Sequence, residues 1–300
     1  MYAIIDVGSN TIRLTVYRVY KDDFKILFNQ KVMAGLAGYV EDNKITQEGI
    51  DTACKALANF KSIVDNFNIE NLLVFATASL RNVENTDEAV SQICKKTGIN
   101  VEIISGEEEA RLDFEGATHN IIDMNSGLLV DIGGGSTELV SYENKEIINA
   151  VSIHLGSLKL YKKCVENIIP TKSESEKLQK TSVKELEKVN EIKKQKYSVI
   201  CGVGGTIRAV LKLNNFIFKA HETNRTITVS NLQKILEVLR KGETEGVNTI
   251  LKVCPDRIHT IIPGITLLYN IAKFYDCDMI TVSSYGVREG YLYDRVINKN

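Results

Sequence analysis

The sequence contains one short motif twice, and this repeat constrains the fold more than any other feature. The stretches "AIIDVGSNTIRLTV" (residues 3–16) and "LLVDIGGGSTELVS" (residues 128–141) share an apolar run, an aspartate, a glycine turn with hydroxyl residues and a second apolar run. Two β-rich runs joined by a glycine turn are typical of a β-hairpin. The repeat therefore predicts two related domains that each begin with a hairpin.

The register of the two copies superimposes the aspartates, the first glycines and the hydroxyl residues. The matched pairs are Asp6 with Asp131, Gly8 with Gly133, Thr11 with Ser136, and Arg13 with Glu138. We assign the first domain to residues 1–117 and the second to residues 118–300, with a last helix that can dock back on the first domain.

Strand and helix signals alternate after each copy, which indicates an α/β fold. In the first half, the expected elements are the strands "KILFNQKVMA", "NLLVFATAS" and "VEIIS" and helices around residues 47–66 and 86–97.

The second half shows the same alternation. Pro170-Thr171 opens a charged amphipathic stretch over residues 173–195, and the strand "YSVICGVGG" follows. A helix in "TVSNLQKILEVLRKG" is expected to be capped by Ser230 and stopped by Gly242. The run "CDMITVSSYGVREGYLYDRVI" predicts a strand, a turn and a last helix.

Composition indicates a globular chain and excludes several classes of partner. The 300 residues are 44% hydrophobic, and their formal net charge is −1. Because there is no overall basic field to attract nucleic acid, a polyanion site must be a local concentration of positive charge. No stretch reaches the ~18 apolar residues of a membrane span, and no leader pattern is present. We expect a cytoplasmic monomer or homodimer with neither a membrane nor a nucleic-acid partner.

The six cysteines are scattered without a C-x-x-C pair, and several lie in apolar runs. Buried free thiols in a reducing compartment fit this pattern better than disulfides or a zinc site. The four histidines show no metal-ligand spacing either.

Both glycine turns carry groups that can bind an anion. The first offers backbone N–H groups and the side chains of Ser9, Asn10 and Thr11. The second offers Gly134, Gly135, Ser136 and Thr137. Glycine lets the backbone approach an anion closely. A tight hairpin would explain one such turn, but two turns can clamp one phosphate chain.

Acids beside these turns predict a hard cation. Asp6, Asp131 and Glu138 supply oxygen ligands, which suit magnesium or manganese. Potassium is expected as a further ion.

Two more segments can contribute to an anion site. "VICGVGGTIRAV" (residues 199–210) follows a strand and opens a helix, so the N–H groups of Gly204 and Gly205 can meet an anion. It lacks G-x-G-x-x-G, no G-x-x-x-x-G-K-[ST] occurs, and helix–strand packing alone would explain it. In "ATASLRNVEN" (residues 76–85), Arg81 with Thr77 and Ser79 forms a candidate phosphate clamp, because guanidinium binds phosphate bidentately.

A cluster of acids opens a predicted helix in "SGEEEARL" (residues 105–112). Ser105 is the expected cap, and Glu107, Glu108 and Glu109 lie in the first turn. Acids there offset the helix dipole, which explains one or two of them without catalysis. Glu109 can still project into a cleft, where a positioned carboxylate acts as general base on water.

Taken together, these motifs resemble the exopolyphosphatase / guanosine pentaphosphate phosphohydrolase family almost end to end. The matching segments are "DVGSNTIRL", "TASLRNVEN", "IISGEEEARL", "VDIGGGSTEL", "LGSLKL", "GVGGTIRA" and "VSSYGVREGYL". The resemblance implies an actin-like fold, shared with acetate and sugar kinases and heat-shock chaperones. Such a fold has two related ribonuclease H-like domains and an interdomain cleft.

The resemblance also implies an activity. It implies a metal-dependent exopolyphosphatase that removes the terminal phosphate of linear polyphosphate, with Glu109 activating the attacking water. Asp131 and Glu138 correspond to acids associated with the metal and catalysis, and Arg81 corresponds to a phosphate-binding arginine. Hydrolysis of guanosine pentaphosphate at its 5′ end needs the same chemistry and is the alternative.

The chain departs from the family pattern at Ser284, where many members have an aspartate in S-D-x-x-x-R-E-G. Longer relatives also continue into a helical domain after "VREGYL", and the resemblance implies that their polyphosphate channel uses that domain. We therefore expect this chain to hold long polyphosphate less processively or to prefer shorter chains. A kinase of the same fold is a further alternative, which the glutamate segment disfavours. A non-catalytic polyphosphate or alarmone binder is disfavoured because Glu109, Asp131, Glu138 and Arg81 are all present.

Overall fold

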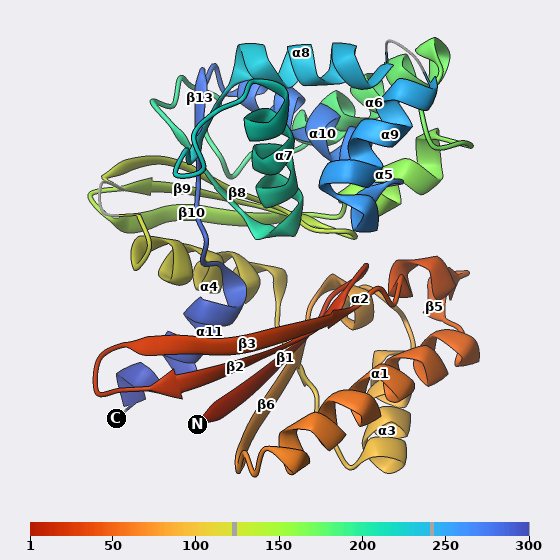
Figure 1. Cartoon of the computed structure of the whole chain (residues 1–300), viewed down its shortest axis with the longest axis vertical. Helices are drawn as coiled ribbons and strands as arrows, with labels where there is room; N and C mark the ends of the chain where they lie inside the picture. Colours follow the sequence, from red (N-terminus) through yellow and green to blue (C-terminus); the bar gives the residue numbers. More distant parts are fainter. Residues whose placement is uncertain (122–124, 241–242, 300) are drawn as a thin grey trace. The chain divides into compact units, whose positions relative to one another are not determined.

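The computed structural model describes residues 1–121, 125–240 and 243–299. The chain divides into two compact units. The first comprises Met1–Glu109 together with Tyr291–Asn300, and the second comprises Ala110–Gly290. Each unit is an α/β body built on its own sheet (Figure 1).

The first unit has a five-stranded sheet in the order β3-β2-β1-β6-β7. Its strands are β1 (Tyr2–Val7), β2 (Ile12–Val19), β3 (Phe24–Val32), β6 (Asn71–Ala76) and β7 (Glu102–Ile103). Its helices are α1 (Gln47–Asn66), α2 (Ala78–Arg81) and α3 (Thr86–Thr97), and its short elements are η1 (Leu36–Tyr39), β4 (Val40–Glu41), β5 (Lys44–Ile45) and η3 (Ile297–Lys299). The predicted helices at 47–66 and 86–97 are confirmed.

The second unit has a six-stranded sheet in the order β10-β9-β8-β11-β13-β12. Its strands are β8 (Ser126–Ile132), β9 (Thr137–Glu143), β10 (Glu146–Ile153), β11 (Ile200–Val203), β12 (Thr226–Thr228) and β13 (Met279–Val282). Its helices are α5 (Ser157–Cys164), α6 (Lys172–Leu186), α7 (Gly204–Ile217), α8 (Val229–Arg240), α9 (Glu243–Val253), η2 (Pro255–Arg257) and α10 (Ile261–Phe274). Two more helices, α4 (Gly106–Thr118) and α11 (Val287–Arg295), begin in one unit and end in the other.

The two sheets confirm the repeat seen in the sequence. β1 pairs antiparallel with β2 and parallel with β6, and β8 pairs antiparallel with β9 and parallel with β11. The turns match as well. The Gly8 N–H donates to the Thr11 carbonyl oxygen at 3.1 Å, and the Gly133 N–H donates to that of Ser136 at 3.0 Å. Each unit therefore begins its sheet with the predicted hairpin.

Regularly spaced apolar residues of α1 form part of the core of the first unit. Ile50, Ala53, Leu57, Phe60 and Val64 recur every three or four residues along α1 and are buried. This spacing places them on one face of the helix, where they pack against the apolar side chains of β1 and β2. Figure 1 shows α1 and α3 together on that face of the sheet.

Alternation along the strands gives the second sheet two buried faces. Leu128, Val130 and Ile132 of β8 join the core formed with α7 and α10. Leu129, between them, packs with Phe114 of α4 in a separate cluster. Successive side chains of a strand point to opposite faces, so helices cover this sheet on both sides.

Two details of the sequence prediction are wrong. The amphipathic helix expected over 173–195 ends at Leu186. Beyond it the chain buries Ile192 and Tyr197, and the Tyr197 N–H donates to the Tyr275 carbonyl oxygen at 3.2 Å, which a continued helix would not allow.

The cap of α8 is Thr228, whose Oγ1 accepts a hydrogen bond from the Asn231 N–H at 3.2 Å, and not Ser230. β12 pairs with β13 up to Thr228, so the helix begins as soon as that pairing stops. The predicted stop at Gly242 lies outside the described residues.

All six cysteines are free thiols, and all except Cys94 are buried. In the described ranges, no helix has the length and apolar character needed to cross a membrane.

Candidate active site

In the first unit, the sheet topology brings Arg81 and Glu109 together. β6 and β7 are parallel neighbours, with Ala76 opposite Ile103, so the segments that follow them start at the same edge. α2 follows β6 and ends in Arg81, while α4 follows β7. Arg81 Nη1 donates to Glu109 Oε2 at 2.7 Å and to the Ile104 carbonyl oxygen at 3.3 Å. Glu109 is 7% exposed, so its carboxylate is held in one orientation.

The three glutamates at the start of α4 have different surroundings. Ser105 Oγ accepts a hydrogen bond from the Glu108 N–H at 3.0 Å, which confirms the predicted cap. Glu107 is exposed, and Glu108 accepts from Arg295 Nη2. Only Glu109 is directed to Arg81. Glu107 and Glu108 are sufficient to offset the helix dipole. Glu109 is the buried carboxylate of the three, and Arg81 fixes its orientation.

The first glycine turn (residues 8–11) is fixed through its backbone. The carbonyl oxygens of Ser9 and Asn10 accept hydrogen bonds from the N–H groups of Ala37 and Gly35, each at 2.9 Å. Ser9 is buried, Asn10 is half-buried, and Thr11 Oγ1 contacts Met33 Sδ at 3.5 Å.

The first turn of α5 holds the second glycine turn (residues 133–136). The Ser157 N–H donates to the Gly133 carbonyl oxygen at 2.9 Å, and two further N–H groups of α5 donate to that of Gly134. Within the described part of the chain, the N–H groups of Gly134 and Gly135 donate to no protein acceptor. Both glycines are half-exposed, and their amides can donate hydrogen bonds to an anion.

The hydroxyls of this turn are buried. Thr137 Oγ1 donates to the Leu155 carbonyl oxygen at 2.6 Å, so this hydroxyl stabilises the turn. Ser136 is also buried. Thr137 Oγ1 is therefore engaged within the protein, whereas the backbone amides of Gly134 and Gly135 are left for an anion.

Two acids face each other across β8 and β9. Asp131 is directly opposite Glu138 in the register, and Glu138, 1% exposed, accepts from Ser152 Oγ at 2.7 Å. Like charges directly opposite each other destabilise a sheet unless positive charge compensates them. Arg208 and Arg257 supply such charge. Burial lowers the pKa of each guanidinium. Carboxylates oppose that shift: Glu289 and then Asp131 at Arg208, and Asp256 and then Asp131 at Arg257.

The third glycine loop packs directly on Asp131. Gly204 has φ +78°, and a Cβ at this position would lie 1.8 Å from Asp131 Oδ1. A Cβ at Gly205 would lie 2.2 Å from Arg257 Nη2, and Arg257 Nη1 donates to Thr206 Oγ1 at 3.2 Å. The guanidinium of Arg257 thus lies against the backbone of this loop. Packing of a helix on a strand would not by itself require a charged group there.

Of the three acids predicted to hold a hard cation, two lie together in the structure. Asp131 and Glu138 form a pair of carboxylates in the second unit, while Asp6 belongs to the first unit and lies opposite Arg13 of β2. Across the described ranges, no three histidine, cysteine, aspartate or glutamate residues cluster as a metal site. Magnesium needs only one or two protein carboxylates when water and substrate phosphates complete its shell, so the acid pair suits it.

Comparison with known proteins identifies the family. The model of the Ppx/GppA phosphatase family matches residues 15–299. The chain belongs to the Ppx/GppA phosphatase family. Its two related α/β units are those of the actin-like fold.

Curated relatives agree with this assignment. Over 293 residues the chain is 27% identical to a Haemophilus influenzae protein provisionally named an exopolyphosphatase, covering 97% of this chain and 90% of the relative. Over 317 residues it is 30% identical to a Fusobacterium nucleatum bifunctional 3-dehydroquinate synthase/phosphatase, covering 99% of this chain and 47% of the relative. The chain therefore spans about half the length of the bifunctional protein.

Solved structures share the fold. An Aquifex aeolicus Ppx/GppA protein superimposes with a TM-score of 0.79 at 25% identity, covering 100% of this chain and 98% of the other. An exopolyphosphatase from Cytophaga hutchinsonii superimposes with a TM-score of 0.85 at 23% identity, covering 98% and 97%.

Hydrogen bonds fix the motif around Ser284, the position at which the sequence resemblance predicts a departure from the family pattern. Asn120 Oδ1 accepts from the Ser284 N–H at 2.8 Å and from Ser283 Oγ at 3.1 Å. Arg208 Nη1 donates to the Ser284 carbonyl oxygen at 3.3 Å. These bonds fix the backbone of the segment, and the Ser284 residue itself is exposed.

Sequence reasoning missed two arginines that lie beside these groups, Arg257 beside the third glycine loop and Arg295 beside Glu108. Arg257 follows a Pro-Asp pair in a short 3-10 turn, and Arg295 lies in the last helix, so neither belongs to a glycine loop or an acidic motif. No local pattern marks either of them as part of a site.

Proposed function

We propose that this Ppx/GppA phosphatase is a cytoplasmic exopolyphosphatase that removes the terminal phosphate of linear inorganic polyphosphate. The observation that carries the proposal is the buried Glu109 carboxylate, held by Arg81 at 2.7 Å. A general base needs a fixed carboxylate within hydrogen-bond reach of the water it activates. The name of the Haemophilus influenzae relative supports polyphosphate as the substrate.

In the proposed reaction, Glu109 takes a proton from water as the water oxygen attacks the terminal phosphorus. The bond from that phosphorus to the bridging oxygen then breaks, which releases phosphate and a chain shorter by one unit. Phosphoryl transfer depends mainly on positioning and on neutralising charge. The amides of Gly134 and Gly135, the helix start at Gly204 and Gly205, and the guanidinium of Arg257 can supply both to phosphate oxygens.

We propose magnesium or manganese as the cofactor, held by Asp131 and Glu138, with Asp6 as a further candidate ligand. When bound, such a cation neutralises charge on the transferring phosphate. The protein's part is to keep the two carboxylates side by side on β8 and β9. Potassium is a second candidate ion, because polyphosphate carries many negative charges.

The second candidate is hydrolysis of guanosine pentaphosphate at its 5′ end. Its chemistry is identical, and the family includes both activities by the resemblance described above. The two candidates differ in what surrounds the phosphate chain beyond the reacting group.

The deciding experiment measures phosphate release from polyphosphates of several lengths, guanosine pentaphosphate and ATP, with magnesium or manganese and with or without potassium. We expect release from polyphosphate that requires the divalent cation. Activity on guanosine pentaphosphate alone would replace the first candidate by the second. Transfer of phosphate from ATP to a sugar or carboxylate acceptor would instead indicate a kinase.

A further inference from the structure

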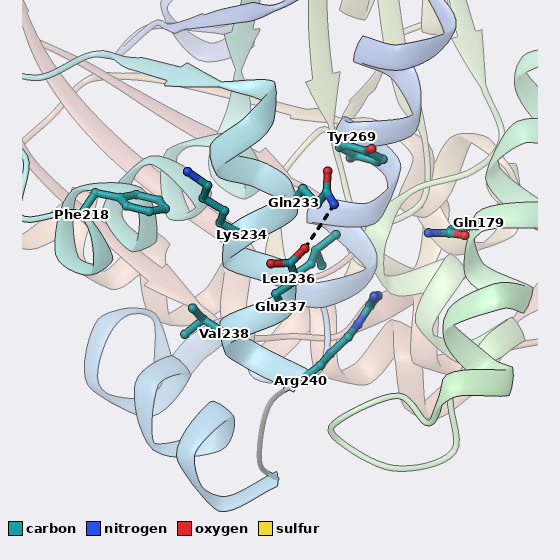
Figure 2. Close-up of a pocket in the computed structure, with 9 residues that line it drawn as sticks. All are labelled: Gln179, Phe218, Gln233, Lys234, Leu236, Glu237, Val238, Arg240 and Tyr269. Carbon is teal, nitrogen blue, oxygen red and sulfur yellow. Dashed lines mark hydrogen bonds between the residues drawn. The ribbon is translucent and has the colours of Figure 1, made fainter.

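A hollow of about 770 Å³ lies in the second unit beside α8. Residues from α6, α8 and α10 line it, among them Gln179, Gln233, Leu236, Glu237, Arg240 and Tyr269 (Figure 2). None of these residues belongs to the glycine turns, the acid pair or the Arg81–Glu109 pair. The proposed phosphatase chemistry therefore leaves the hollow without a role.

Arg240, the last residue of α8, brings a positive charge into the hollow. The residue is half-buried, and its Nε atom has neither solvent access nor a hydrogen-bond partner. Among the described residues, the one hydrogen-bond acceptor that its guanidinium reaches is Thr266 Oγ1, at 3.5 Å, the outer limit of a hydrogen bond. Among the residues that the structure describes, no carboxylate forms an ion pair with it.

Other arginines removed from solvent in this protein have acidic neighbours. Asp131 lies near Arg208 and Arg257, and Glu102 and Glu108 bind Arg295. Burial lowers the pKa of Arg240, and no carboxylate in the described part of the chain opposes that shift. A guanidinium that is partly removed from water and has no described acidic partner is stabilised when an anion pairs with it, so the hollow favours an anionic ligand.

The walls of the hollow provide complementary contacts for the rest of a ligand. Glu237, the nearest acid on α8, accepts a hydrogen bond from Gln233 Nε2 at 3.1 Å. In Figure 2, Arg240 extends from the end of α8 toward the side where Gln179 and Tyr269 lie, whereas Phe218 and Lys234 lie on the other side of the helix. The Tyr269 ring and Leu236 offer apolar surface. A charged head beside Arg240 and an apolar or aromatic body against Tyr269 match this arrangement.

We propose that this hollow binds a small organic anion whose phosphate or carboxylate group pairs with Arg240 and whose apolar body packs against Tyr269 and Leu236. Phosphate and carboxylate both match the planar fork of guanidinium, so the test separates them.

The test uses the absence of tryptophan from the sequence. A Tyr269→Trp substitution places a single fluorescent reporter in the hollow of the full chain, and a Phe67→Trp variant places a control reporter on the exposed surface of the first unit. Both are titrated with phenyl phosphate, benzoate, inorganic phosphate and the uncharged analogue phenol. The series is repeated with Arg240→Met and Arg240→Lys in the Tyr269→Trp background.

We expect saturable fluorescence changes in the Tyr269→Trp variant with phenyl phosphate or benzoate, and the tighter of the two identifies the preferred head group. Arg240→Met should weaken binding by about 10- to 100-fold, as for loss of one charge-assisted hydrogen-bonded pair, and Arg240→Lys by less. Phenol and the Phe67→Trp reporter should show no saturable change. Equal affinity for phenol, unchanged binding in Arg240→Met, or no saturation up to about 10 mM of either anion would overturn the proposal.

The unliganded protein gives a second readout, measured with Tyr269 intact. Without ligand, Arg240→Met should keep or raise the melting temperature, because it removes a charge that has no described acidic partner. Benzoate or phenyl phosphate should raise the melting temperature of the unsubstituted protein more than that of Arg240→Met. A lowered melting temperature of Arg240→Met without ligand would show that the guanidinium has a structural partner, and would also overturn the proposal.

Discussion

Arg81 Nη1 and Glu109 Oε2 lie 2.7 Å apart, and both side chains are largely withdrawn from solvent. Glu109 sits in a helical turn with two other glutamates, yet it is the one held by Arg81. Glu109 therefore has one fixed orientation, whereas Glu107 is exposed to solvent and Glu108 binds Arg295.

Replacing Glu109 by Gln should lower turnover by about two to four orders of magnitude and leave substrate binding in place, because a positioned general base is lost. The matched control is Glu107→Gln, at an exposed position two residues earlier. It should leave turnover nearly unchanged. Steady-state phosphate release measures both variants, and near-normal turnover in Glu109→Gln would locate the base elsewhere, with Glu108 or Glu138 next in line.

Arg81 and Glu109 should be energetically coupled. Arg81→Met leaves a buried carboxylate without its partner and should cost about 3 kcal/mol of unfolding free energy. The double variant Arg81→Met/Glu109→Gln should cost less than the sum of the single variants, with a coupling of at least about 1.5 kcal/mol. Urea unfolding of the four proteins completes the cycle, and strictly additive losses would contradict the pairing.

Gly204→Ala should impair both stability and catalysis. The substitution strains a backbone with positive φ and drives a methyl group into the Asp131 carboxylate, so we expect a loss of about 2–4 kcal/mol and a fall in phosphate release. Gly98→Ala is the control, because Gly98 has φ +69° and open space around it. It should cost about 1 kcal/mol and keep full activity. Equal effects of the two substitutions would mean that contact with Asp131 is unimportant.

Stability should fall in alkaline solution partly through Cys254. Burial, with a smaller contribution from Asp256, raises the pKa of this thiol from its ordinary 9.0 to about 11. Between these values the unfolded chain loses the proton and the folded protein keeps it, so the contribution is complete below about pH 9 and is lost as the pH rises through 11. The difference in unfolding free energy between the unsubstituted protein and Cys254→Ala should shrink by up to roughly 2 kcal/mol over this range. A constant difference in urea unfolding from pH 8 to 11 would contradict this.

Local patterns predicted those parts of the fold that depend on neighbours in sequence. The two hairpins, α1 and α3 and the Ser105 cap follow from apolar period, turn glycines and capping residues. The two glycine turns and the place of Glu109 in the first turn of α4 were predicted the same way, because each lies in one short segment.

Features that depend on distant residues could not be predicted in this way. Arg257 reaches the third glycine loop from 51 residues away, and Arg295 reaches Glu108 from 187 residues away. The end of α6 follows from burial of Ile192 and Tyr197 in a core that only the folded unit provides. Such contacts depend on tertiary packing, on which periodicity carries no information.

The chain passes from the first unit to the second inside α4 and returns inside α11. The second unit is therefore one uninterrupted segment, while the first is assembled from two pieces separated by it. During synthesis every residue of the second unit is added to the chain before Tyr291, whose hydroxyl donates a hydrogen bond to Glu102. The amino-terminal sheet therefore obtains its contact with Tyr291 only after the whole of the second unit has been synthesised.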